Sequence, residues 1–396
     1  MLNTQVQAST VQEPLSEGAV LAAAEQAAGL SDWGADQSFR IGLKELLRYA
    51  EAFHPSPELR ARTYNWVVQI LVTKLHLIDD EKIYPEILQE RIESPLIVVG
   101  LPRSGTTILF DLLALDPASR SPREWEISMP WPAPEQATFD TDPRIAAMQA
   151  AFDQILEAAP GMRDIQRLDA RLPGECNAIM SHHFASLDFA ALLPVPGYDE
   201  WFIRNRVPGQ YPAHRRILQQ LQWRGPRGRW LLKSPVHLFD LNGLLDTYPD
   251  AQLVWSHRDP TKTLSSISSH IHTLHTALGS GIGKDAIGAE QWRNWRTCLE
   301  AGLKAREENP AVEEAIFDIA NRDLLRDPVA AIASIYGHFN RVFTDQFAAR
   351  IAHFMAHHEA AGRVGRHRHS LTAFGLDESD IRTTLAPYYQ RFGQLC

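Results

Sequence analysis

A glycine-bearing turn between a short apolar run and an amphipathic helix constrains the fold more than any other stretch of the chain. Residues 96–99 are typical of a buried β-strand, and helical periodicity starts at Thr106 and stops at Pro117. The same alternation of a strand-like run and a helical run occurs twice more within 229–275, and a further strand is expected at 315–319. The sequence therefore predicts an α/β fold of three layers, with a central parallel sheet covered by helices on both faces.

The first 92 residues differ from the rest because they have helical periodicity without a clear strand. We expect this region, 1–92, to be an N-terminal helical layer packed on an α/β domain of residues 93–396, the two forming one structural unit. A hydrophobic content of 44% allows a core of that size. The proline-rich, aromatic stretch 121–143 is expected to avoid regular helix and to form a lid or a pocket wall.

Composition excludes several classes of partner. The formal net charge of -9 argues against general binding to nucleic acid, so a site for a polyanion would need a local cluster of basic residues. No apolar run reaches the roughly 18 residues of a membrane-spanning helix, so none is expected. The cysteines Cys176, Cys298 and Cys396 are odd in number and widely separated, which predicts a reducing, cytoplasmic location. They lack metal-ligand spacing, so no bound metal is expected. No feature favours a particular oligomeric state.

The turn itself reads Gly100-Leu-Pro-Arg-Ser-Gly105-Thr-Thr and has the glycine spacing of a phosphate-binding loop. Thr106 and Thr107 stand where a nucleoside-triphosphatase loop requires Lys and then Ser or Thr, which argues against an ordinary ATP site. Backbone N–H groups, the helix N-terminus, the Arg103 guanidinium and the hydroxyls of Ser104 and both threonines still favour an anion. The alternative is a plain tight turn whose arginine pairs with a surface acid.

The loop resembles the 5′-phosphosulfate-binding loop of sulfotransferases, which use 3′-phosphoadenylyl sulfate (PAPS). A second stretch, "LVWSHRDPTKTLSS", resembles their 3′-phosphate motif, in which a strand-end Arg precedes a helical Ser by eight residues; Arg258 and Ser266 fit. Asp259 as N-cap and Pro260 at the first helical position place a helix N-terminus beside that arginine. The resemblance covers roughly residues 20–395 and is closest to the bacterial branch of the family.

This resemblance implies a P-loop-like fold that binds PAPS as co-substrate, releases adenosine 3′,5′-bisphosphate (PAP) and needs no metal. By the same resemblance, the donor-binding residues are Arg103, Ser104, Gly105, Thr106, Thr107, Arg258 and Ser266. Arg103 takes the place of a lysine of cytosolic members, as an arginine does in the Golgi tyrosylprotein branch, and would stabilise the transferring group. Lys233, at the end of a predicted central strand, is the second catalytic cation.

The general base is where the chain departs from the best-known pattern of the family. Cytosolic members read Lys-x-His, but Pro235 occupies the histidine position here, and His237 is the remaining histidine candidate. The tyrosylprotein branch uses a glutamate after the helix that follows its loop. Spacing from the loop favours Glu124, whereas the Trp-Glu pattern of the bacterial branch favours Glu126, and we favour Glu126.

These features predict a sulfotransferase that moves the sulfuryl group of PAPS to a hydroxyl of a small apolar acceptor. The alternatives are a P-loop kinase-like transferase that uses ATP and a non-catalytic nucleotide-binding protein. The basic segment 362–370 either offers Arg363 to the 3′-phosphate or is a solvated loop. Six aromatic residues either line the acceptor site or belong to the core, namely Trp125, Trp131, Tyr198, Trp201, Phe202 and Tyr211.

Overall fold

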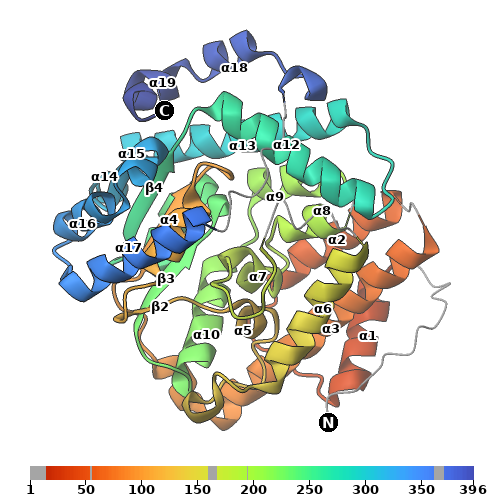
Figure 1. Cartoon of the computed structure of the whole chain (residues 1–396). Helices are drawn as coiled ribbons and strands as arrows, with labels where there is room; N and C mark the ends of the chain where they lie inside the picture. Colours follow the sequence, from red (N-terminus) through yellow and green to blue (C-terminus); the bar gives the residue numbers. More distant parts are fainter. Residues whose placement is uncertain (1–14, 54–55, 159–166, 194, 361–369) are drawn as a thin grey trace.

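A five-stranded parallel sheet forms the centre of the molecule in this computed structural model, which describes residues 15–53, 56–158, 167–193, 195–360 and 370–396 (Figure 1). Its strands are β1 (Leu96–Gly100), β2 (Ser119–Arg120), β3 (Arg229–Lys233), β4 (Gln252–His257) and β5 (Ile316–Ala320). They lie in the order β2-β3-β1-β4-β5, and every neighbouring pair is parallel. The predicted α/β class is confirmed, although the two-residue strand β2 is too short to leave a periodic signal and was missed.

Helices precede the sheet and connect its strands. Before β1 come α1 (Glu17–Ala28), α2 (Phe39–Phe53), α3 (Pro57–Ile83) and η1 (Pro85–Gln89). Between β1 and β3 come α4 (Thr106–Leu113), α5 (Glu124–Ser128), η2 (Gln136–Thr138), α6 (Pro143–Ala158), α7 (Cys176–Ser181), α8 (Asp188–Leu192), α9 (Tyr198–Asn205) and α10 (Gln210–Trp223).

The remaining helices follow β3 and continue to the end of the chain. Between β3 and β5 they are η4 (Pro235–Asp240), α11 (Leu241–Thr247), α12 (Pro260–Ala277), α13 (Lys284–Glu308) and α14 (Pro310–Glu314). After β5 come α15 (Asn321–Arg326), α16 (Pro328–His338), α17 (Asp345–Ala360), η5 (Thr372–Phe374), α18 (Glu378–Thr384), α19 (Ala386–Phe392) and η6 (Gly393–Leu395).

Alternate residues of the strands point to opposite faces of the sheet and bury two different cores. Ile97 and Val99 of β1 pack in a cluster that includes α1, α2, α3 and the C-terminal helix α19. Leu96 and Val98 pack on the other face with α4, α16 and α17 (Figure 1). The N-terminal helices thus share one continuous apolar core with the sheet.

The order of the strands determines where a ligand can reach the sheet. The chain passes from β1 to β2 and β3 on one side and then crosses to β4 and β5 on the other. Open parallel sheets bind ligands at the carboxyl ends of their strands where this reversal occurs. The loop after β1 lies at that point. Within the described residues, no helix is long and apolar enough to cross a membrane.

Candidate active site

The loop between β1 and α4 is held in one conformation by two buried serines and a glycine. Ser104 donates its Oγ hydrogen to the Leu101 carbonyl at 2.7 Å, and its own carbonyl accepts from Ser256 Oγ at 2.8 Å. Gly105 is the N-cap of α4 with a φ of 92°, and a Cβ there would lie 2.0 Å from Asn321 Oδ1. Only glycine can adopt this positive φ without strain and also leave room for the Asn321 side chain. These contacts hold the backbone of the loop in place without a ligand.

Arg103 and Arg258, from the two sequence motifs, meet beside this loop. Arg103 Nε donates to Ser266 Oγ at 3.2 Å, and Arg258 Nη1 donates to the Arg103 carbonyl at 2.9 Å. Burial and the positive charge of Arg258 both lower the pKa of Arg103. In the part of the chain that the structure describes, neither guanidinium forms an ion pair with a carboxylate. Two neighbouring positive charges without a counterion form a site that favours an anion.

The helix that follows Arg258 begins as predicted. Asp259 is the N-cap of α12 and accepts a hydrogen bond from the Thr261 N–H at 3.0 Å, with Pro260 in the first turn. The same carboxylate accepts a hydrogen bond from Tyr389 of α19 at 2.8 Å and pairs with Arg382 of α18. The C-terminal helices therefore hold the start of α12, and with it the strand end that carries Arg258.

Lys233 ends β3, the strand that pairs with β1, and it reaches the same loop. Its Nζ lies 3.4 Å from Thr107 Oγ1 and forms an ion pair with Glu175 Oε1 at 2.6 Å. The lysine side chain is only 4% exposed. A buried ammonium group thus lies at the edge of the sheet that carries Arg103 and Arg258, but unlike these arginines it is paired with a carboxylate.

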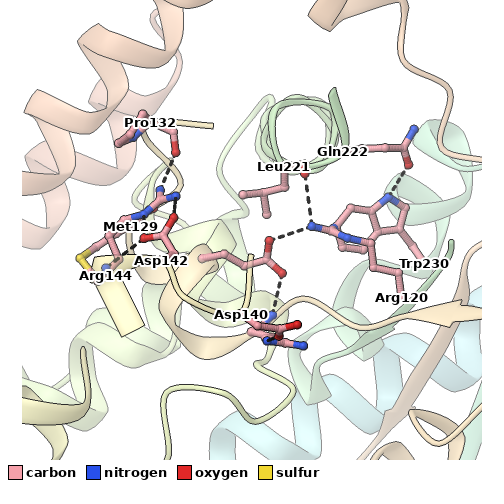
Figure 2. A network of polar contacts seen from close by, with 11 residues as sticks. Arg120, Met129, Pro132, Asp140, Asp142, Arg144, Leu221, Gln222 and Trp230 are labelled. Carbon is pink, nitrogen blue, oxygen red and sulfur yellow. Dashed lines mark hydrogen bonds and ion pairs between the residues drawn. The ribbon is translucent and has the colours of Figure 1, made fainter. Parts of the chain in front are cut away.

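The two candidate glutamates on α5 have different surroundings. Glu126 is fully buried and accepts hydrogen bonds from Arg120 Nη2 at 2.8 Å and from the Arg123 N–H at 2.9 Å. Arg120 also donates to the Leu221 carbonyl at 3.2 Å (Figure 2). Glu126 therefore caps the first turn of α5 through the Arg123 N–H and forms half of a buried ion pair.

Glu124, two residues earlier, is half-buried and belongs to a different cluster. Burial, together with the negative charges of Glu175 and Asp188, raises its pKa to about 8, and Lys233 opposes this rise. Residues two apart on a helix do not face the same way. Glu124 is therefore the α5 carboxyl that acts electrostatically on the Lys233 side of the site.

The 121–143 segment contains the short helices α5 and η2, so the expectation that it avoids regular helix was wrong. Its prolines lie outside residues 124–128, which leaves room for one helical turn. Arg144 donates to the carbonyls of Met129 at 2.8 Å and Pro132 at 2.5 Å and pairs with Asp142 at 2.7 Å (Figure 2). His182 Nε2 bonds to the Ile127 carbonyl at 2.9 Å and ties α5 to α7.

His237, the remaining candidate base, is enclosed in the core. It is fully buried on η4, its Nδ1 lies 3.2 Å from the Tyr211 hydroxyl, and burial lowers its pKa well below the usual range. Four of the six aromatic residues proposed for the acceptor site are also core residues, namely Trp125, Tyr198, Phe202 and Tyr211. Trp131 and Trp201 are only partly buried, and Trp131 stacks on His76 of α3 with 3.7 Å between ring centroids.

Sequence reasoning missed four residues that surround this site: Glu175, Asp188, His270 and Asn321. Glu175, Asp188 and Asn321 come from elements distant from the two motifs, whereas His270 lies four residues after Ser266 on α12. No local pattern marks any of the four. Of the basic segment 362–370, residues 362–369 with Arg363 lie outside the described residues. Among the residues that the structure describes, no group of three or more His, Cys, Asp or Glu side chains could hold a metal ion.

Two kinds of comparison place the chain among known proteins. The model of the Sulfotransferase family matches residues 95–345. An omega-hydroxy-beta-dihydromenaquinone-9 sulfotransferase, Stf3, from Mycobacterium tuberculosis and from Mycobacterium bovis is 24% identical over 283 residues, which are 67% of this chain and 68% of that protein.

Two solved structures match the fold of this chain over nearly its whole length. Sulfotransferase STF9 from Mycobacterium avium is 29% identical with a TM-score of 0.85, covering 97% of this chain and 98% of that one. Sulfotransferase STF1 from Mycobacterium tuberculosis is also 29% identical, with a TM-score of 0.80 and coverage of 94% and 98%. The kinase-like and non-catalytic alternatives are therefore set aside, and the chain belongs to the Sulfotransferase family as a bacterial-type sulfotransferase enzyme.

Proposed function

We propose that this sulfotransferase uses PAPS as donor and transfers its sulfuryl group to a hydroxyl of a small apolar acceptor. One observation carries the proposal: Arg103 and Arg258, 155 residues apart, meet beside a glycine-shaped loop without a carboxylate partner among the described residues. A donor with a 5′-phosphosulfate and a 3′-phosphate carries two separate anionic groups. Two arginines at the end of a parallel sheet fit such a molecule better than a single triphosphate chain.

The donor-binding roles follow from position in the fold. The loop backbone at Ser104, Gly105, Thr106 and Thr107 would hold the 5′-phosphosulfate at the N-terminus of α4. Arg258 and Ser266, on the β4–α12 side, would hold the 3′-phosphate. Arg103 and Lys233 would stabilise the negative charge on the group in transfer, because hydrogen bonds hold both beside the loop.

We assign the general base to Glu124, although the sequence pattern favoured Glu126. The Glu126 carboxylate is engaged by Arg120 and by the Arg123 N–H, so it has a structural role to fulfil. Glu124 would take the proton of the acceptor hydroxyl as its oxygen bonds to sulfur and the bond from sulfur to the 5′-phosphate oxygen breaks. That step leaves a sulfate ester, PAP and a protonated carboxyl group.

The acceptor class rests on the relatives and on the wall of the site. The related mycobacterial Stf3 is named for a hydroxylated dihydromenaquinone, which is an apolar molecule with a hydroxyl. Trp131 and Trp201 of this chain are partly exposed aromatic side chains that would suit such a molecule. A cytoplasmic location remains the prediction from the cysteine content.

The test of the donor is calorimetric titration of the protein with PAP and, separately, with magnesium-ATP. We expect PAP to bind at micromolar level or tighter and ATP, which lacks a 3′-phosphate, to bind at least about tenfold more weakly. Arg258→Ala should weaken PAP binding by about tenfold, because it removes a charge-assisted contact. It should leave the weak binding of ATP unchanged.

Lys262→Ala is the matched control, because Lys262 is an exposed cation in the first turn of the same helix. It should leave PAP binding within about twofold of the wild type. An equal loss of PAP affinity in Arg258→Ala and Lys262→Ala would indicate a general electrostatic effect. Tighter binding of ATP than of PAP by the wild type would contradict the PAPS proposal.

A further inference from the structure

His270 lies one helical turn beyond Ser266 on α12, on the same face of the helix. Ser266 is the residue whose hydroxyl accepts the hydrogen bond from Arg103. A turn of helix advances about 5.4 Å, and the N-terminus of α12 begins beside Arg258. His270 is thus one turn farther along α12 from Arg258 than Ser266 is, and it lies close enough to Arg103 for that charge, in addition to burial, to lower the pKa of its ring.

The imidazole of His270 has an unused hydrogen-bonding atom. Its Nδ1 is buried and has no hydrogen-bond partner among the described residues. Burial and the positive charge of Arg103 lower its pKa to about 4, so the ring is neutral at pH 7. A neutral imidazole offers one donor and one acceptor, and a buried polar atom without a partner costs free energy that a ligand oxygen can recover.

Helix α8 contacts α12 and also carries a residue whose charge acts on Glu124. His275, five residues after His270 on α12, has its Nε2 2.8 Å from the Ala190 carbonyl, a contact that holds α8 against α12. Asp188 begins α8, and its charge is one of those that raise the pKa of Glu124. Helix α8, which packs on the helix that carries His270, therefore also carries an acidic residue that acts electrostatically on Glu124.

We propose that His270 is an acceptor-binding residue, whose Nδ1 hydrogen-bonds an oxygen of the alcohol that receives the sulfuryl group. The inference rests on the proposed function. An uncharged imidazole suits an alcohol oxygen, whereas the anionic oxygens of the donor are matched by arginines and the loop. Since the ring stays neutral beside Arg103, it holds the acceptor without taking the proton that we assign to Glu124.

The test uses citronellol, a primary isoprenoid alcohol, as the acceptor probe with saturating PAPS. His270→Leu should lower kcat/KM for citronellol about tenfold, chiefly through a higher KM, while the Kd of PAP stays within about twofold. His270→Asn should restore most of this loss, because the amide places a polar atom close to the position of Nδ1. His272→Leu is the matched control, since His272 points elsewhere, toward Phe374, and should change neither value.

Three results would overturn the inference. An unchanged kcat/KM in His270→Leu would show that the imidazole does not bind the acceptor. A parallel loss of PAP affinity would place His270 on the donor. A wild-type protein that binds PAP but does not sulfate citronellol would contradict the acceptor class and this inference together, whereas failure to bind PAP at all would contradict the proposed function itself.

Discussion

Glu124 has a carboxyl group whose proton is held unusually tightly. Burial and the charges of Glu175 and Asp188 disfavour the carboxylate and raise its pKa to about 8, well above the usual range of a glutamate, while Lys233 partly offsets them. A general base must be deprotonated before it can accept a proton. Below about pH 8 most Glu124 side chains are protonated, so the proposed base becomes available as the pH rises through that value.

We therefore expect the logarithm of kcat/KM for PAPS to rise with pH below about 8 with a slope of one and to level off above it. Glu124→Gln should lower kcat by at least about 100-fold, because the amide cannot accept the proton. The measurement is the pH profile of initial rates for both proteins. Glu126→Gln serves as the comparison, and its pH profile should keep the midpoint near pH 8. If that midpoint disappeared in Glu126→Gln, Glu126 would again be the favoured base.

The short helix α5 is an element whose position depends on partners elsewhere in the chain. Arg120 is 4% exposed, pairs with Glu126, and has its guanidinium 4.0 Å from the centre of the Trp230 ring. Removing one member of a buried ion pair leaves the other charge without compensation, which is more costly than removing both. The pair therefore links the α5 wall to β3 and α10.

Arg120→Met should lower the free energy of unfolding by about 3–5 kcal/mol, because it leaves the Glu126 carboxylate buried and alone. The double variant Arg120→Met/Glu126→Gln should recover a large part of that loss. Urea denaturation of the wild type, both single variants and the double variant measures the coupling. Additive losses in the double variant would mean that the two side chains act independently, contrary to the geometry.

At the scale of the whole molecule, the core that contains Ile97 and Val99 of the sheet also contains residues of α1, α2 and α3. The regions 1–92 and 93–396 are therefore expected to unfold together, which remains a prediction. The proposed donor site lies between β1, β4 and α12. Binding there should stabilise the entire chain, since a ligand that binds only the folded state shifts the unfolding equilibrium by mass action.

Thermal unfolding followed by far-ultraviolet circular dichroism and by tryptophan fluorescence should give one coincident transition. PAP at 100 times its Kd should add about 2.7 kcal/mol and raise Tm by a few degrees. The Arg258→Ala variant should require a higher PAP concentration for the same shift. Two separate transitions, of which only one responds to PAP, would show that the N-terminal helices form an independent unit.

The sequence by itself determined those parts of the protein that follow from local chemistry. The strand at 96–99, the glycine loop after it and the N-cap at Asp259 are marked by neighbouring residues, because backbone conformation and helix capping act over a few residues. Four of the five strands were predicted for the same reason. Arg103 and Arg258 were also found by local motif, and the structure brings them into contact.

Only the tertiary structure decided which side chains meet around the loop. Glu124 and Glu126 have nearly the same local sequence context. They are distinguished by Arg120, which turns back to pair with Glu126, and by Glu175 and Lys233, which act on Glu124 from distant parts of the chain. Likewise, nothing in the local sequence distinguishes His270 from other histidines on helices. The fold buries it near Arg103, and burial together with that charge lowers the pKa of its ring. Charge and burial act through space, so the roles of these residues depend on packing that no local stretch of sequence contains.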